Sequence, residues 1–211
     1  MKKIYTALLS ICLAAFLLSG CNREKPTAAD SVKAIYDLYI LGDTSGVERL
    51  GMPEEDISNA INAYDNALAE TIRSNFSASG LEMEDETLEA ICRARKEALS
   101  KMNAECTVIS EEGDTAVVEL STTWFDEETL DTDAAYDARE KADAAGYTDY
   151  DEYLNFIMET YTDNLLEEYK NVTPSEDRKE ITVNCIIVNN SWLPEDMAAF
   201  GSELSLAITG Q

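Results

Sequence analysis

The 211-residue sequence contains no histidine, and this absence excludes several classes of enzyme. Ser-His-Asp triads, Cys-His pairs and HExxH zinc sites all require an imidazole. The Ser-x-x-Lys pattern of another group of serine enzymes is also missing. An enzyme with this sequence would have to work with carboxylates, tyrosine, lysine or cysteine. We therefore expect a protein that is not an enzyme.

Basic residues are also scarce. The chain has 16 lysines and arginines against 42 aspartates and glutamates, which gives a formal net charge of −26. Such a charge repels nucleic acids and anionic surfaces, and it favours basic partners or cations. We expect no nucleic-acid partner. The apolar fraction of 45% is typical of a globular protein rather than of a disordered one.

Cysteine is infrequent, and no CxxC pair occurs. Beyond the N-terminal region only Cys92, Cys106 and Cys185 remain. Cys106 and Cys185 both lie in strand patterns, so a disulfide between them is one alternative in a protein outside the cytoplasm. The other alternative, which we favour, is that these residues are small buried apolar side chains.

The N-terminus has the pattern of a lipoprotein signal. Lys2 and Lys3 precede an apolar run of fifteen residues, 4–18. That run is shorter than the ~18 residues expected of a membrane-spanning helix. It ends in Leu18-Ser19-Gly20-Cys21, which resembles the bacterial lipobox. The resemblance implies cleavage before Cys21 and lipidation of its sulfur, whereas the alternative is an ordinary signal peptide cut nearby.

Domain boundaries follow from this pattern. We predict a signal peptide over 1–20, a tether from the lipidated cysteine over 21–27 and a single domain over 28–211. Two acyl chains hold a protein firmly on a bilayer. The expected location is therefore extracytoplasmic, on the outer face of the cell membrane, with the lipid anchor as the membrane contact.

Hydrophobic periodicity predicts the fold class. Apolar residues recur with helical spacing at about 27–42, 53–79, 85–103, 131–145, 148–171 and 194–209. Alternation predicts a β-hairpin at about 104–125, and a strand at about 180–188. Helices separated from a small antiparallel sheet indicate an α+β fold. We expect a concave sheet face near Trp124, with Trp124 on the same face as Leu120.

Four features together resemble a known family. They are the lipobox, the hairpin "AECTVISEEGDTAVVELSTTWFD", the segment 144–195 with its Gly-Tyr junction, helix and strand ending in Trp192, and the closing helix "FGSELSLAITG". The sequence is similar to a group of uncharacterised lipoproteins from Gram-positive bacteria that carry a domain of unknown function. The resemblance implies a cone-shaped fold of the nuclear-transport-factor-2-like and cystatin-like type. It implies no catalytic residues.

The segment 126–168 holds fifteen acids and only two basic residues, Arg139 and Lys141. Calcium binding is one interpretation, because calcium takes several oxygen ligands. However, the Asp131-x-Asp133 and Asp149-x-Asp151 pairs lack the further ligand and the glycine of an EF-type loop. We favour a solvated helical face and expect neither a metal site nor a cofactor.

Six of the ten tyrosines fall in or next to the same segment. Aromatic rings beside acids can hold sugars or organic cations, so Trp124, Tyr150 and Tyr153 are candidate ligand-binding residues. Packing in the core or at its rim is the alternative, and the one that we favour, since Tyr150 and Tyr161 fit an apolar helix stripe.

The sequence thus favours a membrane-anchored, non-catalytic binding or protein-interaction domain. The alternative function is a receptor for a small ligand or cation that uses the concave sheet face and the acidic, tyrosine-rich segment. A carboxylate-dependent hydrolase is the least favoured hypothesis, because no pair of acids stands out. The partner is either a protein or a small molecule.

Overall fold

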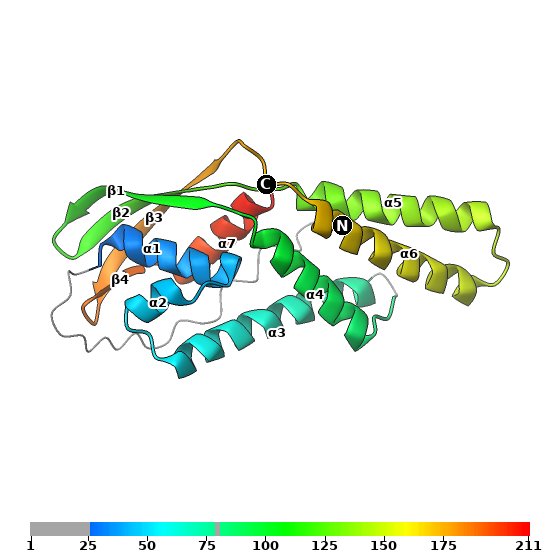
Figure 1. Ribbon diagram of the computed structural model, residues 1–211, viewed down its shortest axis with the longest axis horizontal. Coiled ribbons are helices and arrows are strands. Elements are labelled where there is room, and N and C mark those ends of the chain that lie inside the picture. The colour runs from blue at the N-terminus through cyan, green and yellow to red at the C-terminus, as the bar shows by residue number, and fades with distance from the viewer. Residues whose placement is uncertain (1–25, 79–80) are drawn as a thin grey trace.

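The computed structural model describes residues 26–78 and 81–211, and it confirms the α+β fold (Figure 1). The Cys21 lipobox lies outside these residues. In chain order the elements are α1 (Ala28–Tyr36), α2 (Ser45–Arg49), α3 (Glu54–Ala78), α4 (Asp85–Leu99), β1 (Ala104–Glu112), β2 (Thr115–Thr122), α5 (Glu127–Ala145), α6 (Tyr150–Asn171), β3 (Lys179–Val188), β4 (Ser191–Pro194) and α7 (Met197–Ile208).

Local sequence explains where the first helix begins and ends. The Thr27 side chain accepts a hydrogen bond from the backbone N–H of Asp30, and the Asp30 side chain accepts one from the backbone N–H of Thr27. This reciprocal capping box satisfies N–H groups that have no partner inside the helix. After Tyr36 the chain continues as a short π-helical segment, Asp37–Leu41, and it stops at Gly42 with a φ of 70°. Glycine adopts this left-handed conformation without strain.

The sheet is antiparallel, with the strand order β1-β2-β3-β4. The predicted hairpin forms, with Cys106 opposite Leu120 and a bulge between Val108 and Ser110. The predicted strand at about 180–188 is β3. Strand β4 was not predicted, because four residues that include a proline give no periodicity.

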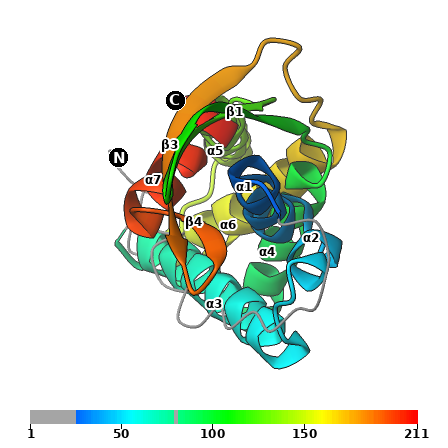
Figure 2. The same ribbon diagram turned by 90° about the vertical axis from the view of Figure 1, so that its left-hand side faces the viewer.

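The inner face of the sheet forms one side of the core. Its buried apolar residues in β2 and β3 are Ala116, Val118, Leu120, Ile181, Val183 and Cys185. Helices α1 and α7 lie beneath this face (Figure 2). Trp124 does not continue the alternation as expected, because β2 ends at Thr122. Phe125 is the buried aromatic at this point, and its N–H donates to the Ile208 carbonyl of α7.

All three cysteines of the described chain are free, so the disulfide alternative is wrong. Strand β2 lies between the strands that carry Cys106 and Cys185. Strands two positions apart are separated by about 9.5 Å, beyond the ~7 Å limit on the Cα distance of a disulfide. Burial raises the pKa of Cys106 to about 12 and that of Cys185 to about 11. Both thiols are therefore protonated at neutral pH.

Among the described residues, no helix is both long and apolar enough to cross a bilayer.

Candidate functional site

A buried ion pair lies where helices α4, α5 and α6 meet. The Arg95 side chain on α4 donates two hydrogen bonds to the Glu127 carboxylate on α5, at 2.7 and 2.9 Å. The Tyr169 hydroxyl on α6 donates to the same carboxylate at 2.6 Å. The two charged side chains are 3% and 0% exposed. The Glu127 carboxylate on α5 therefore links this helix to both α4 and α6 by hydrogen bonds.

Burial disfavours the charged form of Arg95, yet the negative charge of Glu127 keeps the pKa of this guanidinium well above its ordinary value. The sequence interpretation of segment 126–168 as a solvated face is wrong for Glu127. The residue follows Asp126, whose side chain caps α5 by accepting from the Thr129 N–H. A glutamate in the first turn of a helix is expected to face solvent, so its position in the sequence carried no sign of burial.

A second carboxylate lies one turn further along α5. The Tyr161 hydroxyl donates to Asp131 Oδ1 at 2.5 Å. Burial raises the pKa of Asp131, with a further contribution from the charge of Glu127. Two acids on neighbouring turns are the residue types that glycoside hydrolysis needs. Here Glu127 is fully buried and already holds Arg95, so this pair does not face a substrate cleft.

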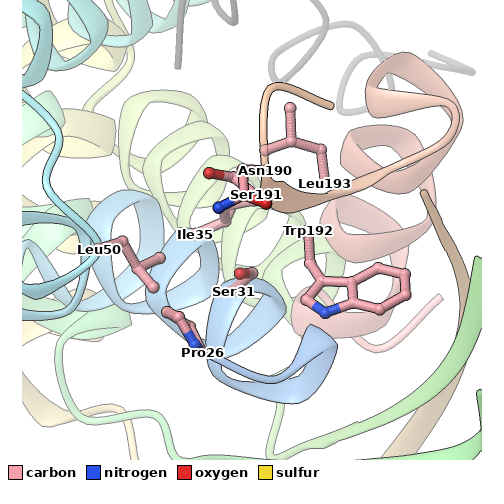
Figure 3. Close-up of a pocket in the computed structure, with 8 residues that line it drawn as sticks. All are labelled: Pro26, Ser31, Ile35, Leu50, Asn190, Ser191, Trp192 and Leu193. Atoms are coloured by element: carbon pink, nitrogen blue, oxygen red, sulfur yellow. The ribbon is translucent and has the colours of Figure 1, made fainter. Parts of the chain in front are cut away.

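A small pocket lies where β4 meets α1 (Figure 3). The space within it that a water-sized sphere can occupy is about 10 Å³, which is room for about one water molecule. It is lined by Pro26, Ser31, Ile35, Leu50, Asn190, Ser191, Trp192 and Leu193. A sugar or an amino acid does not fit in this volume.

The predicted ligand residue Trp124 is half-buried beside the C-terminus. Gly210 packs so closely on the ring that a Cβ there would lie 2.5 Å from Trp124 Cε3. The Lys179 ammonium nitrogen lies 5.2 Å from the ring centroid. The Trp124 ring is therefore already in contact with Gly210, which follows α7, and with Lys179 of β3.

The other two predicted residues, Tyr150 and Tyr153, lie in the first turn of α6. Tyr150 is 71% exposed, so core packing is wrong for this residue, whereas Tyr161 on the same helix is buried. The Tyr153 hydroxyl donates to Asp143 Oδ1 at 2.8 Å. Helix α5 separates them from Trp124, and its 19 residues span about 28 Å. The two tyrosines thus lie within one turn of α6, and Trp124 lies at the other end of α5. Ligand binding by any of the three stays a prediction.

The inner sheet face, where we expected a concave ligand site, is covered in part by α1, which packs against β1, β2 and β4. The hydroxyls of Tyr36 and Thr122 are 2.8 Å apart, and both residues are completely buried. Burial raises the pKa of Tyr36 to about 12. Among the described residues, no group of three or more acids or cysteines is arranged to hold a metal ion.

A family model matches residues 25–199, which is most of the chain. The chain belongs to the DUF5105 family, a domain of unknown function. This DUF5105 domain also shares its fold with the crystal structure of YcdA, a putative lipoprotein from Bacillus subtilis, with a TM-score of 0.63 and 22% sequence identity. The match covers 86% of this chain and 55% of that one, so the chain spans about half the length of YcdA. No curated protein matches the chain.

These comparisons agree with the expected type of family, a domain of unknown function. They do not test the nuclear-transport-factor-2-like cone, which stays a prediction.

Proposed function

We propose that this DUF5105 protein is a lipid-anchored, extracytoplasmic domain that binds another protein and does no chemistry of its own. The observation that carries the anchor is the sequence Leu18-Ser19-Gly20-Cys21 at the end of a fifteen-residue apolar run. YcdA, which shares the fold, is described as a putative lipoprotein, and this is consistent with the anchor. Diacylated Cys21 would hold the domain on the membrane face.

Three features of the domain support protein binding over small-molecule binding or hydrolysis. Helix α1 packs on the inner face of the sheet. The pocket beside β4 has room for about one water. The buried carboxylate Glu127 is engaged by Arg95 and Tyr169. A solvent-exposed surface is therefore the best candidate for recognition.

The anchor is tested by the substitution Cys21→Ser in the full chain, produced in a Gram-positive host. We expect wild type to fractionate with membranes and to incorporate a labelled fatty acid, and we expect the variant to do neither. Cys12→Ser is the matched control, because Cys12 lies within the predicted signal peptide. Membrane association that survives Cys21→Ser would refute the anchor and favour an ordinary signal peptide.

A further inference from the structure

Helices α5 and α6 form an antiparallel hairpin that extends beyond the rest of the domain. Figure 1 shows its far end projecting past α3 and α4. The two helices pack through small residues of α5, because Ala134, Ala138 and Ala142 are all buried and lie one turn apart. The Asn164 side chain of α6 donates to the Ala134 carbonyl at 3.3 Å. The hairpin is thus held by its own contacts.

The far end of this hairpin, residues 143–160, contains no buried residue. Its larger apolar side chains are nevertheless numerous: Tyr147, Tyr150, Tyr153, Leu154 and Phe156, together with Ile157 and Met158, which pack in part against the core. Tyr150 is 71% exposed and Tyr147 is 38% exposed. The rings of Tyr147 and Phe156 are 5.3 Å apart and form an aromatic pair at the turn. We call residues 143–160 the arm tip.

The charge of the arm tip is almost entirely of one sign. No lysine or arginine occurs between Lys141 and Lys170. Exposed acids surround the tyrosines: Asp143, Asp149, Asp151, Glu152 and Glu159. Arg139 and Lys141, on the preceding turn, each pair with an acid of α5. Charge complementarity therefore calls for a basic partner.

The exposed tyrosines offer such a basic partner specific side-chain contacts. Tyrosine and arginine are enriched among the residues that carry interface energy. A guanidinium or ammonium over a tyrosine ring gains cation–π attraction in addition to the attraction of the neighbouring carboxylates. Exposed rings among acids therefore match an arginine- or lysine-bearing protein surface in two ways.

The arm tip also lies at the end of the molecule opposite the start of the domain. Pro26 lines the pocket beside Asn190 and Leu193, and this end of α1 lies at the left of Figure 1, along the longest axis from the arm tip. If Cys21 is the anchor, the tether up to Pro26 spans at most about 18 Å. The arm tip would then lie at the end of the domain opposite its anchored start.

We propose that the arm tip is the docking surface for a basic protein partner outside the cell membrane, with Tyr147 and Tyr150 as its aromatic contacts. The proposal rests on the proposed function, and it adds the surface and the partner's chemistry.

The first experiment measures binding of a short fluorescein-labelled peptide of alternating arginine and alanine to the full chain in non-ionic detergent. Loss of both rings in Tyr147→Ser/Tyr150→Ser should weaken binding about fivefold with no change in net charge. Tyr150→Ser alone, at the more exposed site, should weaken peptide binding about twofold. This single variant keeps the test valid if the double variant does not fold. Tyr136→Ser, on α5 and 65% exposed, is the matched control and should change binding less than twofold.

Charge is tested in the same way. Asp151→Asn/Glu152→Gln at the arm tip should weaken binding more than Glu54→Gln/Glu55→Gln in the first turn of α3. Equal losses from the arm-tip and control variants would mean that the peptide responds to overall charge, and would overturn the proposal.

A photo-crosslinking residue in anchored cells separates this proposal from the proposed function. It is placed at position 150 in one variant and at exposed position 180 on the sheet in another. Adducts at 150 whose crosslinked segment is rich in lysine and arginine support the arm tip. Protein adducts at 180 but not at 150 would overturn the arm tip and leave the proposed function standing. Absence of adducts at both positions would count against both.

Discussion

Replacing Glu127 with glutamine would leave the Arg95 guanidinium buried with no charge to balance it. The wild-type side chains are 3% and 0% exposed, and they meet in two hydrogen bonds of 2.7 and 2.9 Å. Removing one partner of a buried ion pair typically costs about 3–5 kcal/mol of unfolding free energy. A domain has about 5–15 kcal/mol in total, so Glu127→Gln should remove a large part of the stability.

The assay is thermal and urea unfolding followed by circular dichroism. For a domain of this size, 1 kcal/mol corresponds to about 2–4 °C, so the melting temperature should fall by about 6–20 °C. Glu128→Gln is the matched control, because Glu128 is the exposed neighbour on the same helix, and it should change stability by less than about 0.5 kcal/mol.

A double variant tests the physical cause. Arg95→Met/Glu127→Leu removes both charges and keeps apolar volume, and such replacements of buried pairs are often neutral. Its cost should therefore be smaller than the sum of the costs of the two single substitutions. Additive costs, or a Glu127→Gln variant as stable as Glu128→Gln, would refute the reasoning.

Two further predictions concern single charges. The Lys101 ammonium donates to the carbonyls of Tyr169, Lys170 and Val172 at the end of α6, at 3.3, 2.7 and 3.1 Å. Lys101→Met should therefore lower the free energy of unfolding, measured in urea, by about 1 kcal/mol, and Lys170→Met should lower it by less. Equal losses would contradict the inference that Lys101 caps the C-terminal end of α6. For Asp131, burial raises the pKa of the folded state above that of the unfolded state, so the charged form is penalised once pH rises through the folded-state pKa. Asp131→Asn should raise the melting temperature at pH 7 and not at pH 3. Asp137→Asn is the control and should not raise the melting temperature, because it removes a carboxyl whose pKa is lowered by Lys141 and Asn164. A gain for Asp131→Asn that is the same at both pH values would be inconsistent with titration of this group.

Elements with strong local signals were predicted well. The helix predicted at about 27–42 and the alternation around the β1–β2 turn each depend on residues close together in sequence. The prediction failed where a neighbour in space decides the outcome. Trp124 continues the alternation in sequence, but β2 ends at Thr122 and the ring packs against Gly210.

The candidate functional residues also divide into those that local sequence identified and those that depend on distant contacts. Tyr150 and Tyr153 were identified because tyrosine is concentrated among acids, and the structure places both at the arm tip. Their separation from Trp124 depends on the direction of α5, which composition does not describe. Glu127 was assigned to a solvated face because the partner that buries it, Arg95, is 32 residues away in the chain.

The sequence by itself determined the lipobox pattern, the acidic charge, the lack of histidine chemistry and the α+β class, because each depends on composition or on short-range periodicity. The tertiary structure decided which carboxylate is buried, that Cys106 and Cys185 stay apart, and that the helical hairpin projects from the end opposite the start of α1. These outcomes depend on long-range packing and strand order. Such contacts are set by the whole fold, and no local pattern in the chain encodes them.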